Sequence, residues 1–257
     1  MSRPEQPGSS LAIGTRSPPV ETVELRRGLK RFLDQPLADH LPDAPRDSRG
    51  RSITLGSVRW GAYAFYDYEG EPIYVGQTRE RVGGRIGRHL TNQRTDAVAM
   101  AVLDPFEVRA IRVWPLPEYQ EVKGAHPLAA DAAEHLNAIE RAAFLKLVAS
   151  SRFGRVLNEK DPPCAPEREL PASVYGEIVS PEVAAVRMHP DTRIARRAQT
   201  IARLSAIIAS RDVAGGLRRA LLTQADRLSY LAKARFEALG GEALVDERSP
   251  DAATEEE

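Results

Sequence analysis

The first 57 residues contain one segment with helical hydrophobic spacing, which lies between two segments without periodicity. Residues 1–20 are rich in Pro, Ser and Gly, a composition that buries little apolar surface, so we expect disorder there. Residues 21–34 place apolar side chains at helical spacing and predict a short amphipathic helix. Several prolines then interrupt residues 35–57, which predicts loop. We therefore expect residues 1–57 to be a flexible N-terminal extension with one short helix.

A different pattern begins at residue 58. The stretch 58–66, VRWGAYAFY, is aromatic and β-branched, and 73–77, IYVGQ, follows a polar turn, so the two predict an antiparallel hairpin. The alternation in 106–114 predicts a third strand. Helices are predicted over 79–92 and over 131–150, where apolar positions share one face. A Pro pair ends this unit, so one domain is expected over residues 58–163.

The C-terminal third has a second helical pattern. Prolines interrupt residues 164–192, which we predict to be a linker. Ile194, Ala198 and Ile201 then begin a repeat with spacings of four and three, and the repeat resumes after a Gly pair at 215–216. This pattern predicts a helical hairpin with one apolar seam over residues 193–240. Residues 241–257 are predicted to be an acidic, disordered tail.

Basic and acidic residues are distributed unevenly along the chain, although their numbers are equal. The 257 residues hold 36 basic and 36 acidic side chains, so the formal net charge is zero. Ten Lys or Arg and four acids fall in residues 191–240, whereas one Arg and seven acids fall in 241–257. A basic segment before an acidic tail suits a polyanionic partner such as DNA, but on charge alone a solvated basic helix face with a disordered tail is the favoured interpretation.

Composition also excludes several classes of protein. The lone Cys164 rules out an internal disulfide framework and a cysteine-rich zinc site. No apolar run reaches membrane-spanning length, and the N-terminus has no hydrophobic stretch of a secretory signal. We expect a soluble cytoplasmic protein without a membrane partner.

The first candidates for chemistry are two tyrosines and a basic pair. A metal-dependent phosphodiesterase needs a carboxylate for the cation, a positive charge for the phosphate and a group that accepts a proton from water. Tyr63 and Tyr74 lie on adjacent predicted strands, where they could flank a phosphate or simply pack. Arg85 and His89 are four residues apart and share one helix face, which suits phosphate binding or solvation alike.

Two further candidates follow later in the chain. Glu140 borders the apolar face of the predicted helix 131–150, where it could hold a metal or be an ordinary surface acid. Asn158 follows a short apolar run, where it could end a secondary-structure element or hold a carboxylate or a water in place.

Taken together and in this order, these residues resemble the GIY-YIG nuclease family. The matching positions form a Gly-x-Tyr and a Tyr-x-Gly, whose tyrosines are eleven residues apart, followed by an Arg-x-x-x-His, a helical Glu and an Asn. These residues are Gly61, Tyr63, Tyr74, Gly76, Arg85, His89, Glu140 and Asn158. The resemblance covers about residues 58–160. Ala62 and Val75 replace the middle Ile of the two motifs, and Gln77 stands where some repair members carry Lys, which argues against a repair subunit.

The resemblance implies an α+β fold with a small three-stranded antiparallel sheet flanked by helices, here followed by the helical hairpin. It also implies hydrolysis of DNA phosphodiester bonds with a divalent ion, Mg²⁺ or Mn²⁺. Glu140 would be the protein ligand of the metal, and Arg85 would contact the scissile phosphate. Tyr63, Tyr74 and His89 would position and deprotonate the attacking water, with the identity of the base left open. Asn158 would orient the site.

Three hypotheses about function remain. The first is a Mg²⁺-dependent DNA endonuclease in restriction, defence or DNA processing, which would act on both strands as a homodimer or by sequential nicking. The second is a non-catalytic DNA-binding or assembly module on the same scaffold. The third is a helical interaction protein built on the C-terminal hairpin, which leaves the tyrosine, Arg and Glu positions unexplained. The basic hairpin is the candidate DNA-docking element, with packing on the catalytic domain as its alternative.

Overall fold

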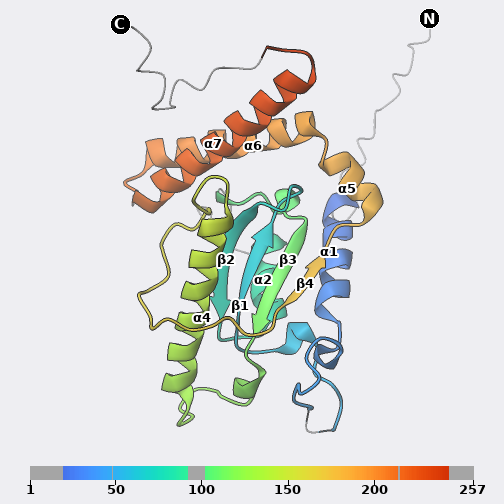
Figure 1. Ribbon diagram of the computed structural model, residues 1–257, viewed down its shortest axis with the longest axis vertical. Helices are drawn as coiled ribbons and strands as arrows, with labels where there is room; N and C mark the ends of the chain where they lie inside the picture. The colour runs from blue at the N-terminus through green and yellow to red at the C-terminus, as the bar shows by residue number, and fades with distance from the viewer. Residues whose placement is uncertain (1–19, 48, 92–101, 214, 243–257) are drawn as a thin grey trace, which may run out of the picture.

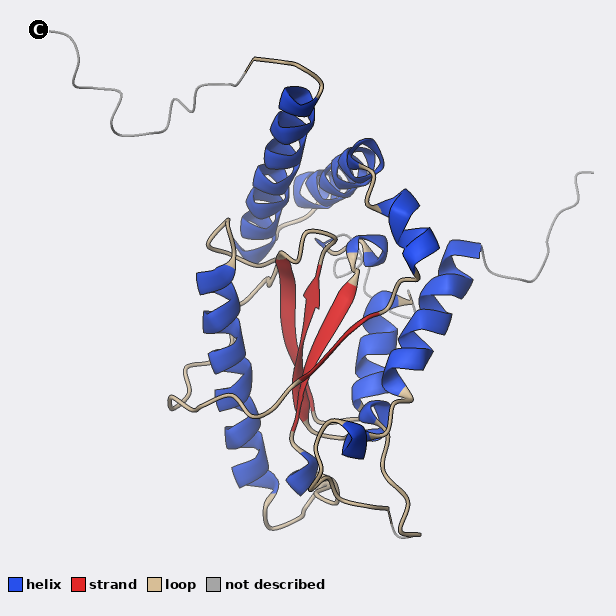
Figure 2. Ribbon diagram, turned by 45° about the vertical axis from the view of Figure 1, so that its right-hand side comes forward, coloured by secondary structure: helices blue, strands red, loops and turns tan. Residues whose placement is uncertain are grey.

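A computed structural model describes residues 20–47, 49–91, 102–213 and 215–242. There the chain forms one four-stranded antiparallel sheet, in the order β2-β1-β3-β4, surrounded by helices (Figures 1 and 2). The predicted α+β class is confirmed. The strands are β1 (Gly61–Tyr66), β2 (Pro72–Thr78), β3 (Ala110–Pro115) and β4 (Val174–Glu177). The helices are α1 (Val20–Leu33), α2 (Val82–Leu90), α4 (Ala129–Ser150), α5 (Pro181–Arg187), α6 (Pro190–Ser210) and α7 (Gly215–Ala238).

Alternating large and small side chains along β1 make the two faces of the sheet different. Tyr63 and Phe65 point to one face, and Ala62 and Ala64 point to the other, because successive residues of a strand alternate. All four are buried, so both faces are covered. The alanines let α4 pack closely on their face, whereas α1 and α2 share a core with the two rings (Figure 1). We call these the alanine face and the tyrosine face.

The fourth strand corrects the prediction of three. β4 lies inside residues 164–192, which were predicted to be a linker, and it pairs with β3 from Val113↔Val174 to Ala110↔Glu177. The same range also contains α5. A Cβ at Gly176 would lie 2.6 Å from the Phe32 ring, so this glycine lets α1 pack directly on the strand backbone. Four residues between prolines, with Val174 alone fully buried, give too short a pattern to predict a strand.

The N-terminal segment is also more ordered than predicted. Leu25, Leu29 and Phe32 of α1 are buried against the tyrosine face, and Leu37 and Leu55 of the following segment are fully buried. The described part of the predicted extension, residues 20–57, therefore belongs to the core, because its leucines are buried in the same hydrophobic cluster as the sheet. Residues 1–19 of that extension lie outside the described residues.

The predicted helical hairpin is present as α6 and α7, which pack on each other above one end of the sheet (Figures 1 and 2). Its seam on α6 is displaced by one residue. Ile194 is only partly buried and Ala198 is exposed, whereas Arg193, Arg197 and the positions that continue their stripe are buried. The prediction was wrong here because it assigned apolar residues to the inner face.

The buried arginines meet one carboxylate at the tip of the β1–β2 turn. Asp67 Oδ2 accepts hydrogen bonds from Arg193 (3.0 Å), Arg197 (3.0 Å) and Arg227 (2.7 Å). Glu107 also pairs with Arg197 at 3.1 Å. The three arginines are 2–3% exposed. Burial raises the pKa of Glu107 and lowers that of Arg227, as expected when ions leave water. These buried salt bridges attach the helical hairpin to the end of the sheet.

The ends of the described region add two findings. Residues 243–257, which make up most of the predicted acidic tail, lie outside the described residues. Among the helices that the structure describes, none is both long enough and apolar enough to cross a membrane.

Candidate active site

Two tyrosines from neighbouring strands form the centre of the site. In the antiparallel register, Tyr63 of β1 lies opposite Gly76 of β2, and Phe65 lies opposite Tyr74, so the three rings share the tyrosine face. The Tyr63 and Tyr74 ring centroids are 6.3 Å apart. A Cβ at Gly76 would lie 2.7 Å from the Tyr63 hydroxyl oxygen and 2.9 Å from the Tyr74 ring. The Tyr-x-Gly spacing thus has a steric reason, since any side chain at position 76 would push the rings apart.

Helix α2 supplies the basic groups on the same face. Val82, Ile86 and Leu90 are buried and fix the helix on the core. His89 then lies beside the tyrosines, with ring centroids 5.8 Å from Tyr63 and 5.3 Å from Tyr74. The spacing of four residues places Arg85 on the same side, one turn earlier.

Arg85 lies directly beside Tyr63. Burial acts to lower the pKa of Arg85, but the hydrogen bond and charge of Tyr63, together with Tyr74 and Glu80, outweigh it and raise that pKa. The site therefore contains a fixed positive charge next to a phenolic oxygen.

Glu140 approaches from the alanine face. It lies on α4, is 8% exposed, and receives a hydrogen bond from Gln77. Burial raises the pKa of Glu140 to about 7, and the Gln77 hydrogen bond and the charges of Arg85 and Arg79 only partly oppose this shift. Since Arg85 lies on the tyrosine face, the two groups meet around β2, which is the edge strand of the sheet.

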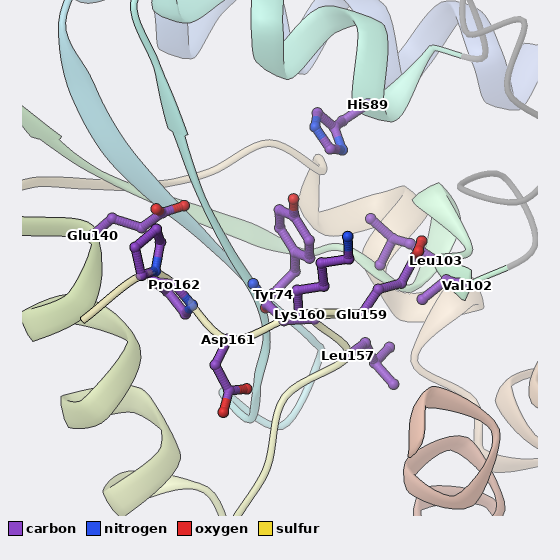
Figure 3. Close-up of a pocket in the computed structure, with 12 residues that line it drawn as sticks. Tyr74, His89, Val102, Leu103, Glu140, Leu157, Glu159, Lys160, Asp161 and Pro162 are labelled. Carbon is purple, nitrogen blue, oxygen red and sulfur yellow. The ribbon is translucent and has the colours of Figure 1, made fainter. Parts of the chain in front are cut away.

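A cavity of about 430 Å³ joins these groups. Glu140, Tyr74 and His89 line it, and the segment 157–163 forms another wall. Figure 3 shows the Glu140 carboxylate and the Tyr74 hydroxyl directed toward the same space, with the His89 ring above them. Acid, phenol and imidazole from three separate elements therefore border one solvent-sized space.

Asn158 plays a different part from the one predicted. Its Oδ1 accepts a hydrogen bond from the Val75 N–H at 3.0 Å, and its Nδ2 donates to the Val75 carbonyl at 2.8 Å. Both polar atoms of the side chain are thus committed to the backbone of β2, beside a Leu157 N–H bond to the Ile73 carbonyl at 2.7 Å. Asn158 closes the open edge of the sheet and positions Tyr74 and the cavity wall through the strand. Asn158 also lines the cavity.

Gln77 is a contributor whose role the sequence analysis missed. Its register partner is Ala62, so its side chain lies on the alanine face under α4. There Nε2 donates to Asn137 Oδ1 at 3.0 Å, and the same side chain bonds to Glu140. The alternation of β2 predicts the face of Gln77, but its partners depend on the rotation of α4.

The described residues contain no group of three or more His, Cys, Asp or Glu side chains arranged to hold a metal ion. A Mg²⁺ ion nevertheless often binds through one or two carboxylates, with water and substrate phosphate as the other ligands. Glu140 fits that mode, because its buried carboxylate borders a cavity with room for several waters at about 30 Å³ each.

No protein-family model matches this chain, and no curated protein or solved structure matches it either.

Proposed function

We propose that this chain is a divalent-metal-dependent endonuclease that hydrolyses DNA phosphodiester bonds. The observation that carries the proposal is that Tyr74, His89 and Glu140, from three separate elements, border one cavity. Tyr63 lies beside Tyr74 and His89, and Arg85 lies beside Tyr63. These are the group types that phosphodiester hydrolysis requires: a carboxylate for a hard cation, a fixed positive charge, and groups that bind and move a proton.

Glu140 is the proposed ligand of a Mg²⁺ or Mn²⁺ ion. The pKa of about 7 means that burial disfavours the charged carboxylate in the free protein. A bound cation would supply positive charge that stabilises this carboxylate and the phosphate oxygens together. The Gln77 hydrogen bond holds the carboxylate in one orientation toward the cavity.

Arg85 is proposed to contact the scissile phosphate. Its guanidinium lies beside Tyr63, and a planar fork can bind two phosphate oxygens at once. Because the group already lies beside Tyr63, little reorganisation is needed when negative charge develops on the phosphate.

The attacking water is proposed to bind between the rings of Tyr63, Tyr74 and His89. Phenolic oxygens orient a water, and an imidazole can accept its proton near neutral pH. Tyr74 and His89 border the cavity directly, whereas Tyr63 is wholly buried and contacts Arg85. This arrangement favours His89 or Tyr74 as the group that takes the proton, with Tyr63 holding Arg85.

The test is cleavage of DNA by the full chain. Supercoiled plasmid, single-stranded DNA and a branched duplex are incubated with Mg²⁺, with Mn²⁺ or with EDTA. Cleavage is expected with the metals and not with EDTA. Glu140→Ala and Arg85→Ala should each lower the cleavage rate by at least about 100-fold, the usual effect of losing one transition-state contact.

Glu134→Ala is the matched control, since Glu134 lies on the same helix but is exposed. It should cut as fast as the parent. Failure of the parent to cut any of the three DNAs with either metal would overturn the assignment in favour of a non-catalytic DNA-binding or assembly module. A Glu140→Ala variant as active as the parent would remove the metal role of Glu140.

A further inference from the structure

Two adjoining hollows lie at the other end of α2 from His89. One, of about 620 Å³, is lined by Arg51, Arg59, Arg81 and Lys123 among others, and the second, of about 530 Å³, by Arg26, Lys30 and again Arg81. Both hollows also share Thr54 and Ser57, so they form one continuous surface. We call the whole the basic surface. It joins α1, the segment after it, and the start of α2, which are distant in sequence.

Half of these cations have acidic partners and half do not. Lys30 pairs with Asp34, Arg51 with Asp47 at 2.8 Å, and Lys123 approaches Glu121 at 4.0 Å. Among the residues that the structure describes, no carboxylate lies within 4.0 Å of a side-chain nitrogen of the other three, Arg26, Arg59 and Arg81. Three positive charges without an acidic partner in the described part of the chain therefore lie on one surface.

The helical hairpin, which the sequence analysis favoured for DNA docking, uses a slightly larger share of its basic side chains in ion pairs within the protein. Its ten basic residues lie at 193, 196, 197, 203, 211, 218, 219, 227, 233 and 235. Six of them form ion pairs with carboxylates of the protein, namely Arg193, Arg196, Arg197, Arg219, Arg227 and Arg235. Of these six, Arg193, Arg197 and Arg227 are buried, so these three are not presented to a partner.

Helix α2 connects the basic surface with the candidate active site. Arg81, which lines both hollows, is the N-cap residue of α2, and Arg85 and His89 follow it at spacings of four, so the three positions form a stripe along the helix. Eight residues at 1.5 Å each separate the ends of this stripe by about 12 Å. That length equals the axial rise of three to four base pairs at ~3.4 Å each.

We propose that the basic surface binds the phosphate backbone of the duplex that flanks the cleaved bond, with Arg81 nearest the site and Arg26 and Arg59 farther along. This inference rests on the proposed function for its choice of partner. The argument is charge complementarity: free guanidinium groups spaced along a surface match a polymer that carries one negative charge per strand at every base pair.

The test measures duplex binding separately from cleavage. The full chain carrying Glu140→Gln, with Ca²⁺ in place of Mg²⁺, is titrated onto a labelled 30-base-pair duplex at salt concentrations from about 50 to 200 mM. The triple variant Arg26→Ala, Arg59→Ala, Arg81→Ala should bind at least about 30-fold more weakly at low salt. Its slope of log affinity against log salt should be smaller by about 2 to 3, because each lost phosphate contact removes about 0.9.

The matched control is the triple variant Arg203→Ala, Arg211→Ala, Arg218→Ala, which removes the same charge from exposed positions of the hairpin. It should lose less than about threefold in affinity. Equal losses in the two triple variants, or a salt slope unchanged by the first, would overturn the inference. Both variants must unfold at the same temperature as the parent, which excludes misfolding as the cause of weaker binding.

The inference and the proposed function fail in different ways. If the parent cuts DNA and the first triple variant binds like the parent, the basic surface is wrong and the nuclease assignment stands. If the parent binds the duplex through these arginines but never cuts, the surface stands and the nuclease assignment is wrong.

Discussion

Replacing Glu140 by Gln should make the protein clearly more stable at alkaline pH and have little effect at acid pH. Gln has the shape of Glu and keeps an oxygen to accept the hydrogen bond from Gln77, but it carries no charge. The substitution therefore isolates the burial of the carboxylate on α4 from its packing.

The magnitude follows from the pKa. Burial raises it from 4.5 to about 7 in the folded protein. Between these values the folded protein holds a proton that the unfolded chain has released, so the free energy of unfolding falls as the pH rises through this window. A shift of that size corresponds to about 3 kcal/mol at pH 8, at ~1.36 kcal/mol per unit. For a chain of this length it corresponds to about 6–12 °C in the midpoint of thermal unfolding.

The assay is thermal unfolding of Glu140→Gln and parent at pH 5 and pH 8 in EDTA, with the exposed Glu134→Gln as control. Glu140→Gln should unfold at a clearly higher temperature than the parent at pH 8 and at an only slightly higher temperature at pH 5, where little of the shift has yet taken effect. Glu134→Gln should match the parent at both. A stabilisation equal at both pH values, or none at pH 8, would refute the reasoning that a buried charge at position 140 strains the fold.

Two other substitutions test the geometry. Gly76→Ala should slow DNA cleavage by at least about tenfold and destabilise the fold by about 1–3 kcal/mol, because its Cβ would overlap Tyr63. Gly84→Ala, whose Cβ would lie 3.9 Å from the Arg88 guanidinium, is the control in the same rate assay and urea titration. Asp67→Ala should lower the free energy of unfolding by about 3–5 kcal/mol, since it leaves three buried arginines without their shared carboxylate. In a urea titration, the exposed Asp191→Ala should have a much smaller effect, and equal effects would contradict the role given to the buried cluster.

The sequence predicts the parts of the fold that have strong local patterns. The hairpin around Tyr63 and Tyr74 and the long helix around Glu140 are long or regular enough to be recognised by their periodicity. β4 cannot be recognised in this way, because its pairing is made by backbone atoms and Val174 is the one fully buried residue among its four. Its place in the sheet depends on β3, which no local window contains.

The helical hairpin shows where classifying side chains only as apolar or polar fails to predict which face of a helix is buried. Arg193 and Arg197 are polar in any hydrophobicity pattern, yet they are buried because Asp67 and Glu107 lie opposite them. The carboxylates are more than 80 residues away in sequence. A local pattern therefore places Ile194 inward, and only the tertiary pairing reveals that the helix is turned by one position.

The candidate site divides in the same way. The residue types and their order identify which side chains to consider, and the structure brings Tyr63, Tyr74, His89 and Glu140 to one place. Asn158 shows the limit, since its type suits several roles and only its two bonds to Val75 show that it ties down a strand.

The salt-bridged tip at Asp67 has a consequence for how such a protein can change over time. Loss of the Asp67 carboxylate would leave three buried guanidinium groups without their shared partner, so we expect positions 67, 193, 197 and 227 to change together during evolution. We also expect residues 58–163 to lose stability when they are separated from the two C-terminal helices.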